Sequence, residues 1–277
     1  MIAILGTGLL GAGFTRAARR RGEEVRVWNR THERARPLAD VGAQVCETAA
    51  EAVRGATRVH VVVADDAAVD AVLAAARPGL APGTLIVDHT TTSTAGARAR
   101  TAAWPREGQV YLHAPVFMGP QNANDATGVM MVSGDRTTVE RAKPLLAPMT
   151  GKLVDLGERV DAAAAFKLCG NMFLMAMTSG LAEMLALAGA MGVGAKEIAG
   201  LFDHFNPGTT VGMRLGRMTE AQFEPPSWEL AMARKDARLI AAEAEGAGVS
   251  LALVPAIAAW MDVALKAGDA HLDWTVI

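Results

Sequence analysis

The sequence is poor in cysteine, with only Cys46 and Cys169 among its 277 residues. These two are far apart and form no Cys-x-x-Cys unit, so the chain predicts neither a disulfide framework nor a zinc site. Its six histidines show no metal-ligand spacing either. We therefore expect no bound metal.

The chain also lacks an excess of charge of either sign. Lys and Arg number 27 and Asp and Glu 29, a formal net charge of −2. This balance gives no general attraction to nucleic acid or to an acidic membrane surface, and we expect neither partner. The opening residues, MIAILGTG, carry no basic stretch or cleavage site before an apparent strand, which indicates a cytoplasmic protein.

Hydrophobic residues make up 51% of the sequence, enough for the cores of two domains. Over residues 1–157, short β-branched runs alternate with alanine-rich helical stretches, which predicts a parallel sheet covered by helices on both faces. The remainder, residues 158–277, is helical in pattern. We expect an α/β Rossmann-type N-terminal domain followed by an all-α C-terminal domain, joined through a long helix.

The expected elements can be placed along the chain. The strands are Ile2–Leu5, Glu24–Trp28, Val59–Val63, Leu85–Asp88, Val110–His113, Val129–Ser133 and Lys152–Asp155. The helices are Gly11–Arg20, Glu33–Val41, Ala67–Ala76, Thr138–Ala147, Ala162–Met191, Ala195–Phe205, Val211–Met218, Trp228–Gly246 and Leu253–Ala267.

A glycine-rich loop follows the first expected strand. Gly6-Thr-Gly-Leu-Leu-Gly11 opens a helix directly after that strand, and this context distinguishes it from glycines that recur by chance. Gly6 permits a tight turn, Gly8 lets the backbone approach a pyrophosphate, and Gly11 lets the helix pack closely on the strand. We expect dinucleotide binding here, with Leu9 and Leu10 among the cofactor contacts.

The end of the second strand bears on the choice of nucleotide. NAD sites usually carry Asp or Glu there to hold the ribose 2′-hydroxyl. This strand ends in Asn29-Arg30-Thr31, which has no carboxylate to repel a 2′-phosphate and has a guanidinium that could hold one. The pattern favours NADP over NAD. The alternative is that Arg30 is a surface residue before a helix capped by Thr31.

The fourth strand is followed by Asp88-His-Thr-Thr-Thr-Ser93. Hydroxyl groups at the carboxyl end of a parallel strand are placed to contact a cofactor ribose or a substrate. Ser and Thr are equally common at helix starts and in loops, so from the residues alone both interpretations stay open.

The segment DAAAAFKLCGNMFLMAMTSGLAEM, Asp161 to Met184, has only one charged side chain, Lys167, between Asp161 and Glu183. The stretch is long enough to span a membrane. Its alanines contribute little to insertion, however, and a central lysine opposes it, so a helix buried in a soluble protein is favoured. Lys167 and Asn171 are four residues apart and share one face of that helix.

This pair fits proton transfer. An ammonium can protonate the alkoxide that forms when a hydride reaches a carbonyl, and a neutral amine can take the proton back. Apolar surroundings disfavour the charged form and lower the pKa of a lysine, while an amide such as that of Asn171 can position the oxygen. The alternative is that Lys167 extends to water and Asn171 stabilises a helix contact.

Taken together, these motifs resemble the β-hydroxyacid dehydrogenases, which include 3-hydroxyisobutyrate dehydrogenases and glyoxylate and succinic semialdehyde reductases. The resemblance covers essentially the whole chain: the glycine loop, NRT, DHTTTS, HAPVFMG, FKLCGN and ARKD come in the family's order. It implies a Rossmann domain, an all-helical domain, and a homodimer or homotetramer.

The resemblance also implies roles for individual residues. Lys167 would be the catalytic lysine with Asn171 beside it, and Thr91 would lie next to the cofactor and the substrate. Lys235 and Asp236 match the family's late Lys-Asp pair, on a helix that approaches the cofactor. On the residues alone, this pair would be assigned to a solvated helix face.

One segment departs from the family pattern. Members typically read D-x-P-V-S-G-G in the substrate loop, whereas this chain reads HAPVFMG, with Phe117 and Met118 in place of Ser and Gly. The change removes a hydroxyl and adds apolar surface, which favours a larger or less acidic carbonyl substrate. Beyond Gly119, Gln121 and Asn122 are candidates to replace the lost polar contacts. Alternatively, Phe117 packs away from the pocket.

The sequence therefore predicts an NADP-dependent oxidoreductase that moves hydride to or from a small carbonyl or hydroxy acid. An imine reductase of the same architecture is the enzymatic alternative, which the apolar loop favours and the lysine opposes. A non-catalytic NADPH-binding protein is the alternative of a different class, and Lys167 with Asn171 speaks against it.

Overall fold

The computed structural model describes residues 1–277, which divide into two compact units, Met1–Met172 and Phe173–Ile277. The helix α7 (Ala162–Ala190) contains the point of division. It begins five residues after the boundary predicted at residue 157. The domain limits expected from the sequence, residues 1–157 and 158–277, stay predictions.

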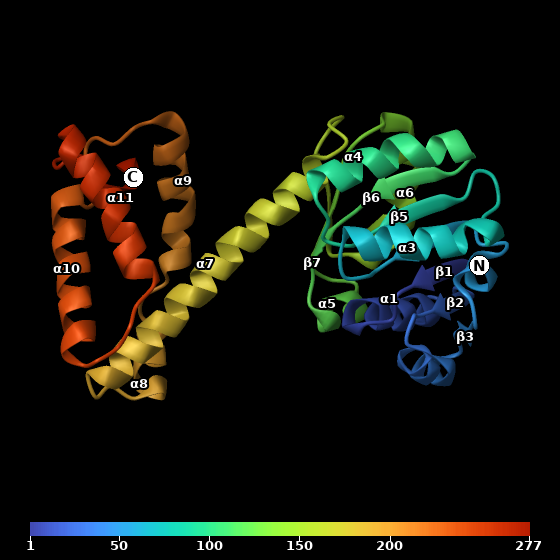
Figure 1. The fold of residues 1–277 in the computed structure, drawn as a ribbon, viewed down its shortest axis with the longest axis horizontal. Coiled ribbons are helices and arrows are strands. Elements are labelled where there is room, and N and C mark those ends of the chain that lie inside the picture. The colour runs from blue at the N-terminus through green and yellow to red at the C-terminus, as the bar shows by residue number, and fades with distance from the viewer. The chain divides into compact units, whose positions relative to one another are not determined.

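The N-terminal unit contains a six-stranded sheet in which every pairing is parallel. The strand order is β3-β2-β1-β4-β5-β6 (Figure 1). The strands are β1 (Ile2–Leu5), β2 (Val25–Trp28), β3 (Gln44–Val45), β4 (Arg58–Val61), β5 (Leu85–Asp88) and β6 (Val110–His113).

Both faces of this sheet are buried, as the continuous apolar strands predict. The helices of this unit are α1 (Leu9–Arg20), α2 (Ala49–Val53), α3 (Asp66–Ala76), α4 (Thr94–Ala103), α5 (Pro120–Asp125) and α6 (Arg136–Leu146), and the 3₁₀ turn η4 covers Trp104–Glu107. Ile2 and Ile4 of β1 belong to one core, with α1, α5 and α6, while Ala3 and Leu5 belong to the other, with α2, α3 and η4. The Rossmann-type α/β fold is thereby confirmed.

Two expectations for this unit were wrong in detail. The segment predicted as one helix, Glu33–Val41, forms two 3₁₀ helices, η1 (His32–Arg34) and η2 (Arg36–Val41), because Pro37 cannot donate the i→i−4 bond of an α-helix. The predicted strands also do not all join one parallel sheet: β7 (Val116–Phe117), β8 (Val129–Val132) and β9 (Lys152–Asp155) form a second sheet, in which β7 and β8 pair antiparallel.

The absence of β7 from the six-stranded parallel sheet has a simple cause. Only Ala114 and Pro115 separate β6 from β7, and a parallel return requires a crossover of a dozen or more residues. The chain therefore bends at this point, and β7 joins a new sheet. The strands β3 and β7 are two residues long, too short to give a periodic signal in the sequence.

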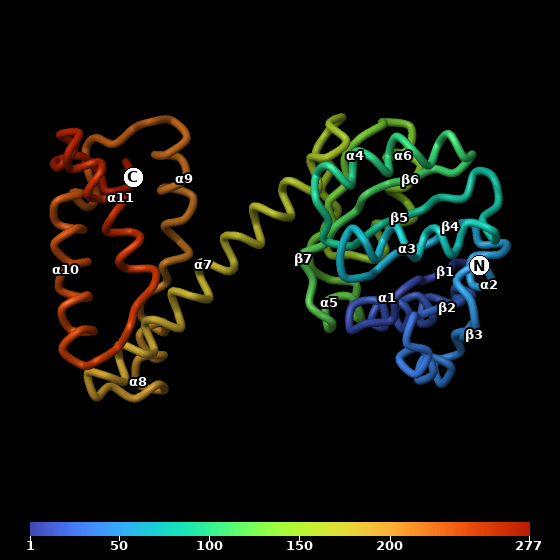
Figure 2. The backbone as a smooth tube through the Cα atoms, viewed as in Figure 1, coloured from blue at the N-terminus to red at the C-terminus, as the bar shows by residue number.

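The C-terminal unit is helical. It contains the second half of α7, then α8 (Ala195–Ala199), α9 (Val211–Glu220), α10 (Leu230–Gly246) and α11 (Leu253–Ala267). The helix expected over Ala195–Phe205 stops at Ala199 and continues as a 3₁₀ turn from Gly200, a poor helix former. In Figure 2, α10 and α11 run side by side, and they share a small apolar core.

Two carboxylates fix the connections of this unit. Glu183 of α7 accepts the backbone N–H groups of Ala252 and Leu253 at 2.6 and 2.7 Å, which satisfies the N-terminus of α11. Near the end of the chain, the buried Asp273 accepts the backbone N–H and the hydroxyl of Ser227 at 2.7 and 2.6 Å. Its pKa is held well below its usual range by these bonds and those from Thr275, against the opposing effect of burial.

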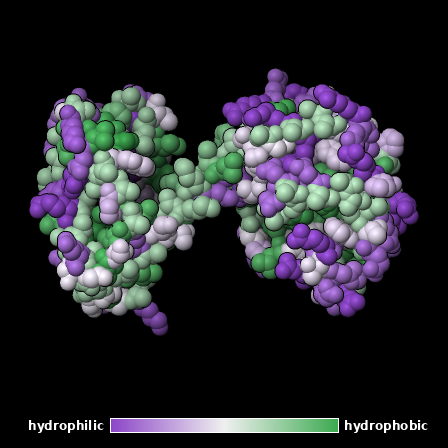
Figure 3. Space-filling model, viewed as in Figure 1, coloured by the Kyte–Doolittle hydropathy of each residue, from purple (hydrophilic) through white to green (hydrophobic).

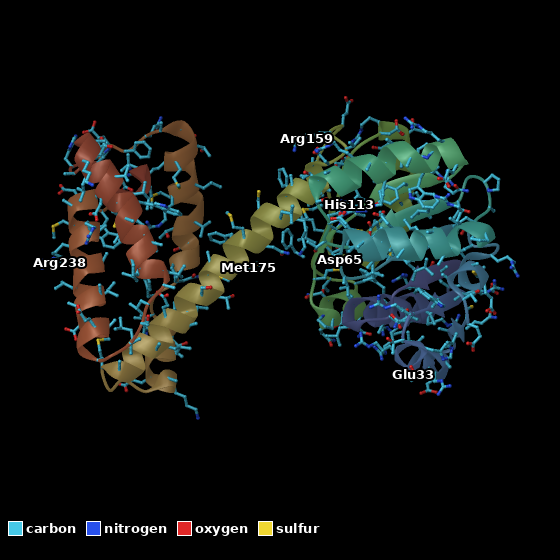
Figure 4. All side chains as sticks on the ribbon, in the orientation of Figure 1. Glu33, Asp65, His113, Arg159, Met175 and Arg238 are labelled. Carbon is cyan, nitrogen blue, oxygen red and sulfur yellow. The ribbon has the colours of Figure 1, made fainter.

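The helix α7 is left largely uncovered by its own chain. It is long and apolar enough by length and composition to cross a membrane, and only 6% of its most apolar window is buried. Apolar side chains run along it in Figure 3, and Met175, labelled in Figure 4, is 67% exposed. Neither unit by itself supplies the cover that the sequence predicts for this helix.

Candidate active site

The glycine loop has the geometry that its sequence predicts. Gly6 has φ +98°, and a Cβ there would lie 2.1 Å from the carbonyl oxygen of Val62. A Cβ on Gly11 would lie 2.0 Å from the carbonyl oxygen of Gly6, so only glycine lets α1 approach β1 this closely. Gly8, the N-cap of α1, faces open space and adds no capping side chain.

The first turn of α1 therefore presents free backbone N–H groups and the positive end of the helix dipole. Asn29 holds the loop in place: its Oδ1 accepts the N–H of Thr7 at 2.9 Å, and its Nδ2 donates to the carbonyl of Thr31 at 2.8 Å. This loop fits a pyrophosphate. Asn29 contributes mainly by bracing it.

A cavity of about 660 Å³ opens above the loop within the N-terminal unit. Among its lining residues are most of the predicted cofactor contacts: Gly6, Gly8, Leu9, Leu10, Asn29, Arg30, Thr31 and Thr91. Gly11 packs behind the loop and does not line the cavity.

One further cationic residue lines this cavity, and the sequence reasoning missed it. Arg34 lies at the end of η1, four residues after Arg30, and both guanidinium groups are exposed. Its spacing of four residues from Arg30 is a signal available in the sequence, but Arg34 lies within the helix predicted over Glu33–Val41, which the structure replaces with 3₁₀ turns.

The loop after β5 is held by a buried carboxylate. Asp88 is fully buried; it accepts the hydroxyl of Tyr111 at 2.7 Å and the backbone N–H of Thr90 at 2.9 Å. The guanidinium of Arg100 donates to the Tyr111 hydroxyl at 3.2 Å, and burial raises the pKa of Tyr111 well above its usual range. These bonds place Thr90 and Thr91 on the cavity wall.

Two buried histidines support the same loop from inside the sheet. Arg58 Nε donates to His60 Nε2 at 3.0 Å, His60 Nδ1 lies 2.9 Å from His89 Nε2, and His89 Nδ1 lies 2.7 Å from the carbonyl oxygen of Ala114. Because Arg58 can only donate, each ring must be neutral with its proton on Nδ1. Burial lowers the pKa of His89 to about 4 and holds that of His60 well below its usual range.

Lys167 lines the cavity near the start of α7. Its Nζ donates to Asn171 Oδ1 at 3.0 Å, as the four-residue spacing predicts. The Nζ also lies 4.2 Å from the centroid of the Phe117 ring. Burial lowers the pKa of the Lys167 ammonium. The one charged side chain of this segment thus belongs to the same cavity as the glycine loop.

Of the residues expected to contact substrate in the segment 117–122, only Met118 lines the cavity; the others lie beside Lys167 or around α5. Met118 lines the cavity, while Phe117 lies against α7 beside Lys167. Gly119, Gln121 and Asn122 instead make local bonds around α5: Asn122 Oδ1 accepts the Gly119 N–H at 2.9 Å, and Gln121 donates to Asp125 at 2.5 Å.

Lys235 and Asp236 lie on α10, in the C-terminal unit, where their side chains form an ion pair at 2.8 Å. Their contacts with cofactor and substrate, which the family resemblance implies, stay predictions.

The fold, the glycine loop and the open N-terminus of α1 define an NAD(P)-binding protein of the Rossmann class. A family model described as the NAD binding domain of 6-phosphogluconate dehydrogenase matches residues 1–157. A probable 3-hydroxyisobutyrate dehydrogenase of Mycobacterium tuberculosis is 36% identical over 201 residues, 71% of this chain and 67% of the relative.

Two other similar proteins match over the full length. Glyoxylate/succinic semialdehyde reductase 1 of Arabidopsis thaliana is 24% identical, over 100% of this chain and 96% of its own. An imine reductase of Myxococcus stipitatus, solved with NADP+, is 23% identical with a TM-score of 0.93, covering 100% of this chain and 98% of its own. The chain belongs to the β-hydroxyacid dehydrogenase family of NAD(P)-dependent oxidoreductases.

Proposed function

We propose that this protein is an NADP-dependent oxidoreductase that transfers hydride between the nicotinamide and a small carbonyl or hydroxy-acid-type compound, with Lys167 as proton donor and acceptor. One observation carries the proposal. The ammonium of Lys167, paired with Asn171, lines the same cavity as the glycine loop.

The residues divide the work in a simple way. A bound nicotinamide supplies or accepts the hydride. Lys167 donates a proton to the substrate oxygen during reduction and, as a neutral amine, accepts it during oxidation. Burial lowers the pKa of Lys167, which makes the neutral amine easier to reach than in an exposed lysine. Asn171 Oδ1 is engaged with Lys167, so its Nδ2 is left to donate to the substrate oxygen.

The preference for NADP rests on charge. No carboxylate follows β2 where an NAD-preferring site would hold the ribose 2′-hydroxyl, and Arg30 and Arg34 both line that part of the cavity. Two guanidinium groups can hold a 2′-phosphate through bidentate, charge-assisted hydrogen bonds.

Reduction of an imine is a second candidate, favoured by the apolar side chains of Phe117 and Met118. The iminium form that accepts hydride is cationic, however, and the ammonium of Lys167 would repel it. A carbonyl substrate avoids this repulsion. A non-catalytic NADPH-binding protein would have no use for the Lys167–Asn171 pair.

We also propose that the protein works as a homodimer or homotetramer. Phe166, Met172, Phe173 and Met175 of α7 are each more than half exposed within the chain. An apolar surface of this kind typically marks an interface, and symmetric pairing of identical chains is the usual way to cover it.

The replacement Lys167→Met tests the catalytic assignment, because it removes the ammonium while keeping most of the side-chain length. We expect kcat for NADPH-dependent reduction across a panel of aldehydes, keto acids and imines to fall by about 10²- to 10⁴-fold. NADPH binding, followed by its fluorescence, should stay within about threefold, since Lys167 is not needed to hold the phosphates.

Lys152→Met, at an exposed lysine of β9, is the matched control and should retain full activity. Near-normal turnover by folded Lys167→Met would reject the role of this lysine. A wild-type protein that binds NADPH but reduces nothing in the panel would support the non-catalytic alternative.

A further inference from the structure

The ring of Phe117 lies on one turn of α7, against two residues that share a helix face. Its centroid is 4.2 Å from Lys167 Nζ, and a Cβ added at Gly170 would come within 2.3 Å of Phe117 Cζ. Residues three apart on a helix are neighbours, so the ring bridges the space from Lys167 to Gly170. The bare backbone at Gly170 is what lets the ring lie this close.

This arrangement uses two of the three directions in which the Lys167 ammonium can donate. Asn171 Oδ1 takes one N–H at 3.0 Å, and the face of the Phe117 ring takes a second as a cation–π contact. One N–H is left for the cavity. A carbonyl oxygen needs one donor, whereas a carboxylate is bound best by two parallel donors.

No second cation of the cavity lies near this point. Its only other cationic side chains, Arg30 and Arg34, follow β2, toward one edge of the six-stranded sheet. Phe117 follows β6, at the opposite edge, four strand positions from β2, or about 19 Å at the usual strand spacing. Val116 and Met118, which line the cavity next to Phe117 in the sequence, are apolar.

A carboxylate placed beside Lys167 would therefore lose its hydration and gain one charge-assisted hydrogen bond, from the remaining N–H of Lys167, with only the neutral amide of Asn171 as a second donor. A neutral substrate of the same size would lose nothing comparable, and its apolar part would contact Val116 and Met118. The ring of Phe117 is the element that decides between the two, because removing it frees the second N–H of Lys167 and opens space for water or a second oxygen.

We infer that Phe117 determines the substrate class: it restricts the site to uncharged aldehydes or ketones with an apolar substituent and discriminates against oxo acids and hydroxy acids that carry a carboxylate in place of that substituent. This inference rests on the proposed function and narrows its substrate.

The test compares two aldehydes of equal chain length, butanal and succinic semialdehyde, which differ by a methyl group in place of a carboxylate. We measure kcat/KM for each with saturating NADPH and take their ratio, which is insensitive to the fraction of folded enzyme. The wild-type ratio should favour butanal by about tenfold or more, because a buried charge without a partner is rejected strongly.

Phe117→Ser should shift this ratio toward succinic semialdehyde by about tenfold, since it frees the Lys167 donor and adds a hydroxyl. Phe117→Leu, which keeps an apolar group of similar bulk and is the safer variant for folding, should retain most of the butanal preference. If the shift seen in Phe117→Ser came only from looser packing, Phe117→Leu would show part of it as well. If it comes from exposing the Lys167 ammonium, only Phe117→Ser shows it.

A wild-type preference for succinic semialdehyde, or an unchanged ratio in folded Phe117→Ser, would overturn the inference. Both results leave the proposed function intact as long as Lys167→Met abolishes turnover. Failure of the proposed function is a different result: no aldehyde is reduced, or Lys167→Met remains active on both.

Discussion

Lys167 owes its chemistry to the few groups around its ammonium. Asn171 and the face of Phe117 partly compensate for the loss of water, while burial lowers the pKa of the amine. No carboxylate near the ammonium stabilises its charged form, so its proton is released more easily than from a lysine in an ion pair. Arg30 and Arg34, which line the same cavity, are exposed, and their guanidinium groups are available to bind an anionic group.

Arg30→Glu puts a carboxylate where a 2′-phosphate would bind. We expect the Kd for NADPH to rise by about 100-fold and that for NADH to change little or improve, because the new charge repels the phosphate and can accept the ribose hydroxyl. Arg34→Ala should weaken NADPH binding by about tenfold. Fluorescence titration with both cofactors gives these constants.

Arg36→Ala is the matched control, because Arg36 is exposed in the same segment and does not line the cavity. It should leave both constants unchanged. Equal NADPH affinity in Arg30→Glu and the parent protein would show that Arg30 takes no part in choosing the cofactor.

Among the elements, β4 and β5 carry the polar groups that position the active-site loop. The neutral rings of His60 and His89 connect Arg58 of β4 to the carbonyl of Ala114, just before β7. Protonation of either ring would place a second proton where a lone pair is needed, on His60 Nε2 facing Arg58 or on His89 Nε2 facing His60 Nδ1. This chain of hydrogen bonds therefore forms only when both histidines are neutral.

This dependence predicts a loss of stability in mild acid. The pKa of His89 is about 4 in the folded protein and that of His60 is also lowered, against about 6.5 in an unfolded chain. The unfolded state takes up these protons first, so stability is complete above pH 6.5 and falls as the pH drops from 6.5 toward 4. For His89 alone the loss between pH 8 and pH 5 is about 2 kcal/mol.

Urea unfolding followed by circular dichroism at pH 8, 7, 6 and 5 measures this loss directly. The double variant His204→Asn, His271→Asn removes two exposed histidines and should show the same pH profile as the parent. A free energy of unfolding that stays constant from pH 8 to pH 5 would contradict the neutral-histidine arrangement.

For the whole molecule, α7 raises the question of assembly. Its exposed apolar side chains would be costly to leave in water, and neither unit of this chain covers them. Pairing with a second copy would bury this surface and supply the cover that the sequence predicts for the helix.

Light scattering at micromolar concentration should accordingly give two or four times the mass of one chain. Met175→Glu, which places a charge in the centre of the exposed stretch, should shift the protein toward the monomer. Val41→Glu adds the same charge at an exposed apolar residue of η2 and should leave the mass unchanged. A wild-type monomer, or recovery of the protein with membranes, would argue against the assembly.

The sequence by itself determined the features that depend on local spacing. The turn at Gly6, the close approach at Gly11 and the shared face of Lys167 and Asn171 follow from backbone geometry within a few residues. The alternation of strands and helices likewise predicted the Rossmann-type sheet. Pro37 shows the limit of this reasoning, because the apolar pattern around it outweighed a single residue that prevents an α-helix.

Only the tertiary structure decided which distant residues meet. Phe117 reaches Gly170, and Arg58 is joined through His60 and His89 to the segment before β7, because the register of the strands and the bend after β6 bring these segments together. Such contacts link residues dozens of positions apart, and neither propensity nor periodicity encodes them. The glycine loop and the proposed proton donor could thus be predicted from the sequence, whereas the groups that surround them became visible only in the packed fold.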